Sequence, residues 1–201
     1  MKALDQSLTS SERLADLVVQ AQASPYDTDE DWIHLIARGD RVAFERLYRS
    51  YQNRLLSYLF RMLQSREAAE EVFNDVMHVV WKDASRFRGR SKVSTWIFGI
   101  ARYKALSHLG KRKLSTVDDP EGVVELVDEA QNPEGSVISR DLIKRVLEHL
   151  SPEHREVIEL TFYAGLSYQQ IAEIMKCPVN TVKTRMFYAR QHLQKLAARL
   201  A

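Results

Sequence analysis

The stretch LSYQQIAEIMKCPVNTVKTRMFYARQHLQKL, residues 166–196, decides how the C-terminal part of this chain folds. Ser167 is suited to cap a helix that begins at Tyr168, and Pro178 separates this helix from a second one, whose first turn tolerates proline. Apolar or small residues stand where two crossing helices must pack: Ile171, Ala172, Met175 and Val182. The pattern predicts a helix-turn-helix. Lys176 occupies the turn position that usually holds glycine, and a left-handed conformation there costs about 1 kcal/mol.

The second predicted helix has one apolar face and one polar face. Its apolar residues recur in alternating steps of four and three: Val182, Met186, Ala189, Leu193, Leu196 and Leu200. The other side carries hydrogen-bonding, cationic and aromatic residues: Asn180, Lys183, Thr184, Phe187, Tyr188, Gln191 and Lys195. Such a face suits the major groove of DNA, where Phe187 could contact a thymine methyl group. The alternative is a helical hairpin whose polar face is only solvated.

The composition favours an all-α protein and argues against several other classes. The chain has 201 residues with only five prolines and seven glycines. No apolar run approaches the ~20 residues that span a bilayer, and the N-terminus lacks a secretory signal, so we expect no membrane insertion. The single cysteine, Cys177, fits a reducing cytoplasm and a packing role. The scattered histidines form no ligand spacing with it, so we expect no metal and no cofactor.

The net charge of +2 conceals an uneven distribution along the chain. Residues 1–29 carry a net charge of −3, residues 30–113 of +8, residues 114–139 of −7 and residues 140–201 of +4. Two basic blocks around an acidic one indicate two nucleic-acid-facing domains joined by a linker. The acidic block is either a solvated spacer or a strand of negative charge that occupies a basic channel in place of nucleic acid.

Residues 31–113 follow helical patterns. Asp40 is placed to cap a helix with this apolar face: Phe44, Leu47, Tyr48, Tyr51, Leu55, Leu59, Met62 and Leu63. Ser65 is placed to cap the next helix, in which we expect these residues to be buried: Ala69, Val72, Phe73, Val76, Val79 and Val80. The early carboxylate Glu67 suits that helix N-terminus. Asp75 lies too far along for this role, and we expect it to face solvent or a partner.

A strongly basic segment follows. Residues 84–113 carry nine cations and no carboxylate, with Trp96, Phe98 and Tyr103 interleaved among the cations. Cations and aromatic rings together fit an unstacked strand, because phosphates meet Lys and Arg while bases stack on rings. The alternative is that the apolar residues, Trp96 and Ile97 among them, form a core and the cations a solvated face. We expect that both descriptions apply.

Four stretches, in this order and spacing, resemble an extracytoplasmic-function (ECF) sigma factor of RNA polymerase. They are AFERLYRSYQNRLLSYLFRML, AAEEVFNDVMHVVWKDASRFRG, STWIFGIARYKALSHLGKR and the helix-turn-helix. The resemblance implies two small helical domains: sigma domain 2 at residues 30–113 and the helix-turn-helix sigma domain 4 at residues 136–201. The acidic linker between them, residues 114–135, is then expected to thread polymerase channels. Residues 1–29 form an N-terminal extension, to which we assign only a short amphipathic helix through Leu14, Leu17 and Val18.

The resemblance also implies three sets of binding residues. A core-binding set docks on the β′ clamp helices of core RNA polymerase: Glu70, Glu71, Asn74, Asp75 and His78. A −10 set captures a flipped base and holds the separated promoter strand: Arg88, Arg90, Ser91, Lys92, Ser94, Trp96, Arg102 and Lys104. A −35 set reads the upstream element: Asn180, Thr181, Lys183, Thr184, Arg185, Phe187, Tyr188 and Arg190. The expected partners are core polymerase, through its β′ and β subunits, and promoter DNA, with an anti-sigma factor as a further candidate.

Two other classes compete with this interpretation. A conventional helix-turn-helix regulator shares residues 166–196 but binds duplex DNA without core polymerase and usually has a ligand pocket. An enzyme needs a Gly-rich phosphate loop, metal-ligand spacing or a nucleophile–base pair, and the sequence contains none of these motifs. We therefore expect no catalytic residues. The regulator remains the alternative function.

Overall fold

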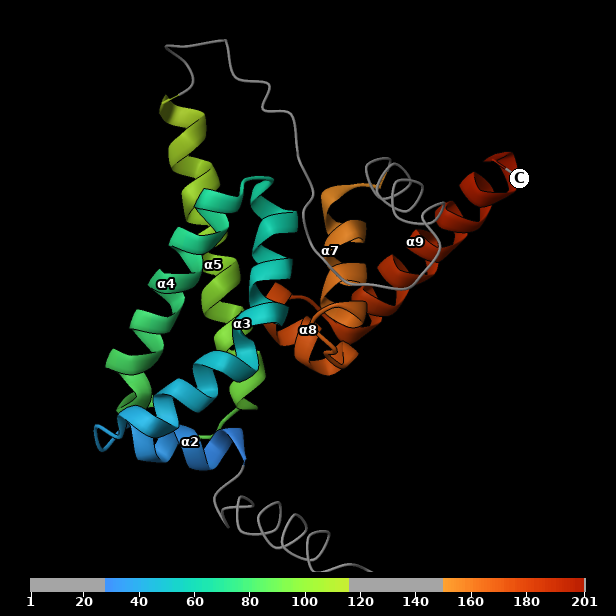
Figure 1. The fold of residues 1–201 in the computed structure, drawn as a ribbon. Helices are drawn as coiled ribbons and strands as arrows, with labels where there is room; N and C mark the ends of the chain where they lie inside the picture. Colours follow the sequence, from blue (N-terminus) through green and yellow to red (C-terminus); the bar gives the residue numbers. More distant parts are fainter. Residues whose placement is uncertain (1–27, 116–149, 201) are drawn as a thin grey trace, which may run out of the picture.

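The structure is a computed structural model that describes residues 28–115 and 150–200, with the side chains up to residues 111 and 195. Within these ranges every regular element is helical (Figure 1). The elements are α2 (Asp29–Ile36), α3 (Arg41–Leu63), α4 (Arg66–Asp83), η1 (Ala84–Arg86), α5 (Val93–Ser115), α7 (Pro152–Phe162), α8 (Tyr168–Met175) and α9 (Val179–Leu200). The predicted all-α class is confirmed. Residues 1–27 of the extension, 116–135 of the linker and 136–149 of predicted domain 4 lie outside the described residues, with the side chains of Leu196 and Leu200.

The predicted caps begin the helices. The Asp40 carboxylate accepts hydrogen bonds from the backbone N–H groups of Val42 and Ala43, at 2.8 and 3.0 Å, at the start of α3. The Ser65 hydroxyl accepts one from the Ala68 N–H, at 3.2 Å, at the start of α4. Each bond satisfies a donor that the first helical turn leaves without a partner. The sequence prediction of these two starts is confirmed.

Helices α2 to α5 form an N-terminal unit. In Figure 1, α4 runs alongside α3 and α5, and α2 crosses their lower ends. The centre of the unit holds four aromatic residues that are fully or almost fully buried: Tyr51, Tyr58, Phe73 and Phe98. Tyr58 meets Phe98 edge-to-face, with ring centroids 5.6 Å apart. Burying side chains of this size contributes about 1.5–3 kcal/mol each. Of the residues expected to be buried in α4, Val79 is only half-buried.

Helices α7 to α9 form a C-terminal unit, in which α8 and α9 make the predicted helix-turn-helix. The Ser167 hydroxyl accepts from the Gln170 N–H, at 3.4 Å, and the Gln170 side-chain oxygen accepts from the Ser167 N–H, at 3.0 Å. Lys176 closes α8 in the left-handed conformation, with φ 52° and ψ 48°. Four predicted core residues of the motif are buried: Ile171, Ala172, Met175 and Val182. The motif is confirmed down to its unusual turn residue.

The two units pack against each other. Helices α7 and α8 lie beside α3 and α5, whereas α9 extends away from the N-terminal unit (Figure 1). Direct contacts link α3 to α7 and α5 to α8. This packing decides which faces of α5 and α9 are available to a partner.

Candidate nucleic-acid interface

The polar face of α9 is open to solvent. Phe187 is 63% exposed and Tyr188 47% exposed, whereas the preceding Met186 is buried. Phe187 and Tyr188 meet edge-to-face, with ring centroids 5.6 Å apart. The apolar stripe holds the opposite side of the helix, since Val182, Met186 and Ala189 are all buried. The rest of the −35 set is exposed or half-buried along α9: Asn180, Thr181, Lys183, Thr184, Arg185 and Arg190.

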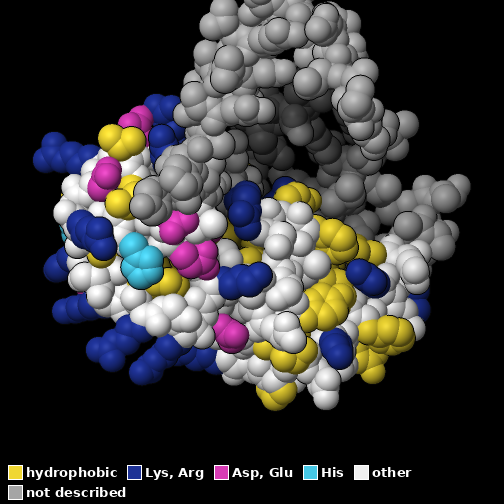
Figure 2. Space-filling model, turned by 90° about the horizontal axis from the view of Figure 1, so that it is seen from below, with side chains coloured by type: hydrophobic (Ala, Val, Ile, Leu, Met, Phe, Trp, Pro, Cys, Tyr) yellow, Lys and Arg dark blue, Asp and Glu magenta, His cyan; other side chains and the backbone are white. Residues whose placement is uncertain are grey.

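One aromatic residue of this surface was not predicted. Phe162, in the last turn of α7, is 62% exposed, and the Arg190 guanidinium lies 6.0 Å from the centre of its ring. His154 of α7 approaches Tyr188, with ring centroids 6.3 Å apart. The sequence does not indicate that Phe162 belongs to this surface, because only the packing of α7 on α9 brings it beside α9. Figure 2 shows hydrophobic side chains interspersed with Lys and Arg over the right-hand part of the molecule, where α8 and α9 lie in Figure 1.

The loop that leads into α5 is basic and exposed. Arg88, Arg90 and Lys92 are exposed around Gly89, whose φ of 64° lies in the left-handed region that glycine adopts without strain. Trp96 is half-buried and packs on Phe87, with ring centroids 5.3 Å apart. Ile97 and Phe98 are buried, so the predicted core role of this segment is confirmed, and its binding of a strand stays a prediction. Core residues hold α5 in place, and the cations before it face solvent.

Three members of the −10 set make contacts within the chain instead. The Arg102 side chain forms an ion pair with Glu156 of α7, with Nε to Oε1 at 2.8 Å. The Ser94 hydroxyl accepts a hydrogen bond from the Gln170 side-chain amide, at 2.9 Å. Lys104 pairs with Asp75 of the core-binding set, at 2.9 Å. Sequence reasoning did not foresee these pairings, because they join residues far apart in the chain.

The core-binding set lies on the outer side of α4. All five of its residues are exposed: Glu70, Glu71, Asn74, Asp75 and His78. Glu70 also pairs with Arg66 one turn earlier, at 3.1 Å. A pair of this kind on an exposed helix surface contributes only a few tenths of a kcal/mol. Glu67 is held by the Ser65 hydroxyl at 2.9 Å, as its predicted place at the helix start requires, and hydrogen bonds to its backbone and to Ser65 lower its pKa.

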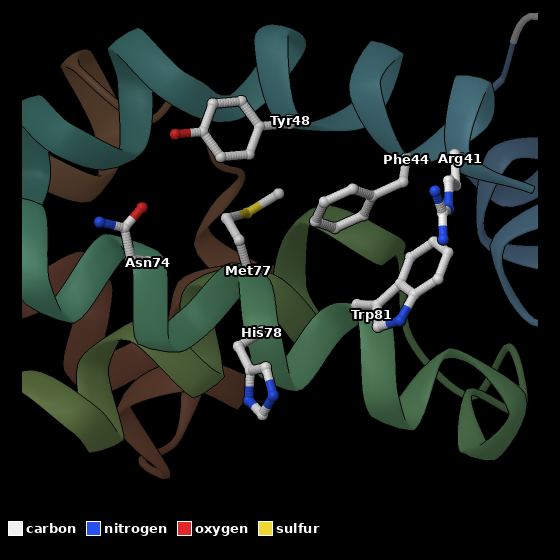
Figure 3. A pocket seen from close by; sticks show the side chains of 7 residues that line it. All are labelled: Arg41, Phe44, Tyr48, Asn74, Met77, His78 and Trp81. Atoms are coloured by element: carbon white, nitrogen blue, oxygen red, sulfur yellow. The ribbon is translucent and has the colours of Figure 1, made fainter. Parts of the chain in front are cut away.

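An apolar groove of about 530 Å³ adjoins this set between α3 and α4. It is lined by Arg41, Phe44, Tyr48, Asn74, Met77, His78 and Trp81. Figure 3 shows Phe44, Tyr48 and Met77 turned toward one another between the two helices, while His78 points away from α3. Phe44 and Trp81 meet edge-to-face, at 5.1 Å between ring centroids. Phe44 and Tyr48 belong to the apolar face predicted for this helix, and the structure leaves both half-buried.

Two carboxylates of α7 are buried where the units meet. Glu156 is 9% exposed and Glu159 3% exposed. Burial raises the pKa of Glu159 to about 7, although Arg61 and Arg155 oppose the shift. The hydroxyl of Tyr58 donates a hydrogen bond to Glu156, at 3.0 Å, and burial together with Glu156 holds the Tyr58 pKa well above its ordinary value. Helical periodicity did not predict that these two acids are buried, because they face the other unit.

Within residues 28–115 and 150–200, no helix combines the length and the apolar character needed to cross a membrane. In the same ranges, no three His, Cys, Asp or Glu side chains gather in a group that could hold a metal ion.

Comparisons with known proteins place both units in one family. The model of Sigma-70 region 2 matches residues 47–114, and that of Sigma-70 region 4 matches residues 140–193. The RNA polymerase sigma-H factor of Pseudomonas aeruginosa is 30% identical, over 84% of this chain and 93% of the relative. The ECF RNA polymerase sigma-E factor of Haemophilus influenzae is 33% identical, over 83% of this chain and 94% of the relative. That of Escherichia coli is 32% identical, over 82% and 91%.

Solved structures agree with this result. The sigma factor RpoE of Bartonella quintana, in complex with the anti-sigma factor NepR, is 29% identical and superimposes with a TM-score of 0.63, over 72% of this chain and 89% of that chain. CnrH, in complex with the cytosolic domain of CnrY, shares the fold with a TM-score of 0.64, at 20% identity over 87% of this chain and all of that chain. The helix-turn-helix, the basic segment before α5 and these relatives lead to one conclusion: the chain belongs to the ECF family of RNA polymerase sigma factors.

Proposed function

We propose that this sigma factor directs core RNA polymerase to promoters through three surfaces of the chain, and that it does so in the cytoplasm without catalysing a reaction itself. The −35 set on α9 reads the upstream element, the −10 set holds the separated strand, and the core-binding set docks on polymerase. The observation that carries the proposal is the presence in one chain of two separate surfaces with exposed cations beside aromatic rings, one on α9 and one at the loop before α5. A conventional regulator needs only the helix-turn-helix.

Each DNA surface has the side chains that its role needs. On α9, the exposed Phe187 and Lys183 stand on the side opposite the buried stripe, as insertion into a major groove requires. Before α5, exposed arginines flank a half-buried Trp96, which suits a strand whose bases are unstacked. Capture of such a strand costs a few kcal/mol of unpairing, least at flexible A·T-rich steps. Binding could therefore open the promoter without hydrolysis.

The docking surface combines charge with an apolar hollow. Four members of the core-binding set present polar or acidic groups, and the groove beside them exposes parts of Phe44, Tyr48 and Trp81. Interfaces of this kind draw most of their affinity from aromatic anchors in a hollow and their orientation from the charged rim. We propose that the β′ subunit contacts both. An anti-sigma factor is a further proposed partner, supported by the complex of the sigma factor RpoE with the anti-sigma factor NepR.

The domain boundaries belong to the same proposal. We place sigma domain 2 at residues 30–113 and sigma domain 4 at residues 136–201, supported by the family matches at 47–114 and 140–193. The linker between them is proposed to thread polymerase channels.

Transcription in vitro on a promoter library tests the function directly. With core polymerase, we expect the chain to initiate at a subset of promoters that share an upstream and a −10 sequence. Core polymerase alone serves as the control. Specific binding to duplex DNA without core polymerase, together with no initiation when core is present, would instead establish the helix-turn-helix regulator.

A further inference from the structure

Domain 4 covers part of the −10 surface in this structure. The Arg102 guanidinium donates two hydrogen bonds to the carboxylate of Glu156 in α7. Nε lies 2.8 Å from Oε1, and a terminal nitrogen lies 3.4 Å from Oε2. Gln170 of α8 donates from its side-chain amide to the Ser94 hydroxyl, at 2.9 Å. Both −10 residues therefore have their hydrogen-bonding groups engaged by the other unit.

Glu156 depends on the N-terminal unit for its partners. It is 9% exposed, and the groups that satisfy its Oε1 are the Tyr58 hydroxyl of α3 and the Arg102 guanidinium of α5. Burying a carboxylate is unfavourable unless hydrogen bonds and an opposite charge compensate. The closed arrangement supplies both. The contact between the units therefore compensates the burial of an acid at this position.

Other contacts at the same junction have complementary charge. Arg54 of α3 donates to the backbone oxygen of Ala164, in the turn between α7 and α8. The Arg61 guanidinium lies 3.7 Å from the centre of the Tyr163 ring. Domain 2 thus presents arginines, and domain 4 presents carboxylates, a carbonyl oxygen and an aromatic face. These are groups that arginine also finds in nucleic acids, as phosphates and base rings.

From this junction we propose that domain 4 acts as an internal substitute for promoter DNA. Glu156 occupies the place of a phosphate at Arg102, and Gln170 occupies the place of a nucleotide at Ser94, so the free chain is closed and this part of its −10 surface is covered. The inference rests on the proposed function of the −10 set. Arginine pairs in the same two-pronged manner with a carboxylate and with a phosphate, so DNA can exchange with Glu156 at little net cost. Binding of the promoter by the polymerase-bound chain then selects the open chain.

A removable cross-link tests whether opening is required. Arg61→Cys and Tyr163→Cys, in a Cys177→Ser background, place two thiols across the junction and outside the three binding sets. A short bifunctional methanethiosulfonate reagent joins the thiols, and a reductant releases them. We expect the cross-linked chain to bind core polymerase normally, while promoter-specific transcription falls about tenfold or more and recovers on reduction.

A matched control uses the same reagent within one helix. Glu45→Cys and Arg49→Cys stand four residues apart on the exposed surface of α3, so that cross-link does not join the units. Its transcription is expected to be the same before and after reduction. If the Arg61–Tyr163 cross-link leaves transcription unchanged, the closed state is not inhibitory and the inference is wrong, while the proposed function stands. If the reduced protein fails to transcribe with core polymerase, both are overturned.

A second variant tests the phosphate substitution itself. Glu156→Gln keeps an acceptor for Tyr58 and removes the charge that faces Arg102. We expect the free variant to bind a mixed-sequence single-stranded DNA about tenfold more tightly. With a donor dye on one unit and an acceptor dye on the other, we expect the efficiency of energy transfer between the dyes to fall. Glu153→Gln is the control, since it removes an equal charge from the exposed side of the same helix. Equal gains in affinity from both variants would show a general charge effect and would contradict the inference.

Discussion

Lys104 of α5 and Asp75 of α4 form an ion pair across 2.9 Å, so a residue proposed to bind the −10 strand is held by a residue proposed to bind polymerase. The side chains are 32% and 56% exposed, respectively. A pair this accessible to water contributes no more than about 1 kcal/mol to folding. We therefore expect the pair to matter for binding, because a partner that engages Asp75 would also free Lys104.

Replacing Asp75 with arginine is expected to abolish docking on core polymerase without unfolding the chain. The substitution reverses a charge on the core-binding face and repels Lys104, but it leaves the core of α4 intact. Competition for core polymerase against a labelled sigma factor measures the first effect, and thermal unfolding the second. Glu45→Arg, an equal charge reversal on exposed α3, is expected to retain docking. Normal core affinity of the Asp75→Arg variant would show that the docking face is misplaced.

Phe187→Ala is expected to weaken recognition of the upstream element by about 1–3 kcal/mol while leaving stability and core binding unchanged, because the ring is exposed and free to contact a base. Lys183→Ala is expected to act in the same direction. Binding of the holoenzyme to promoters with altered upstream elements provides the measurement.

The adjacent Met186→Ala is the contrasting variant. It removes a buried side chain and leaves a cavity, so we expect it to lower the free energy of unfolding by about 2–5 kcal/mol. Equal losses of stability in the Phe187 and Met186 variants would argue against an exposed reading face.

Stability should depend on pH through Glu159. Burial raises its pKa to about 7 in the folded chain, from a usual value of 4.5, so the folded state holds a proton that the unfolded state releases. This contribution is fully present below the unfolded value and is lost as the pH rises toward 7. We expect a loss of about 3 kcal/mol across that interval.

The variant Glu159→Gln isolates this effect. Its free energy of unfolding should fall less between pH 5 and pH 8 than that of the unaltered chain, and it should be the more stable protein at pH 8. Urea denaturation at the two pH values provides the comparison. Glu153→Gln on the same helix is the control, because Glu153 is exposed and hydrogen bonds to its backbone and to Ser151 lower its pKa. A pH dependence that survives in the Glu159 variant would exclude Glu159 as its source.

Lys176→Gly is expected to stabilise domain 4 by about 1 kcal/mol. The lysine adopts φ 52° and ψ 48° at the end of α8, a conformation that glycine reaches without the clash of a Cβ atom. Chemical denaturation measures the gain. Lys176→Ala keeps the Cβ atom while removing the charge, so it should give no such gain. An equal gain from alanine would trace the effect to charge instead of backbone strain.

Much of the fold could be predicted because its signals are local. Asp40, Ser65 and Ser167 cap helices through bonds to residues only two or three positions away. The spacing of Val182, Met186 and Ala189 marks the buried side of α9, and the same spacing leaves Phe187 exposed. A helix repeats every 3.6 residues, so the period of the apolar residues is enough to assign its faces.

Residues at the boundary of a unit were harder to predict. Phe44 and Tyr48 follow the apolar period of α3, yet they line an open groove. Periodicity shows which side of a helix is apolar, but the neighbouring helices decide how much of that side they cover. Phe162 illustrates the converse, since an aromatic residue at the end of α7 stays exposed beside α9.

The sequence by itself determined the helices, their caps, their apolar faces and the family to which the chain belongs, because these depend on residues that lie within a few helical turns of one another. Only the tertiary structure decided that Arg102 faces Glu156, that Ser94 faces Gln170 and that burial raises the pKa of Glu159. Those pairings join residues more than fifty positions apart, across two units whose docking no local pattern encodes. Burial and charge at such a junction exist only once both surfaces have met.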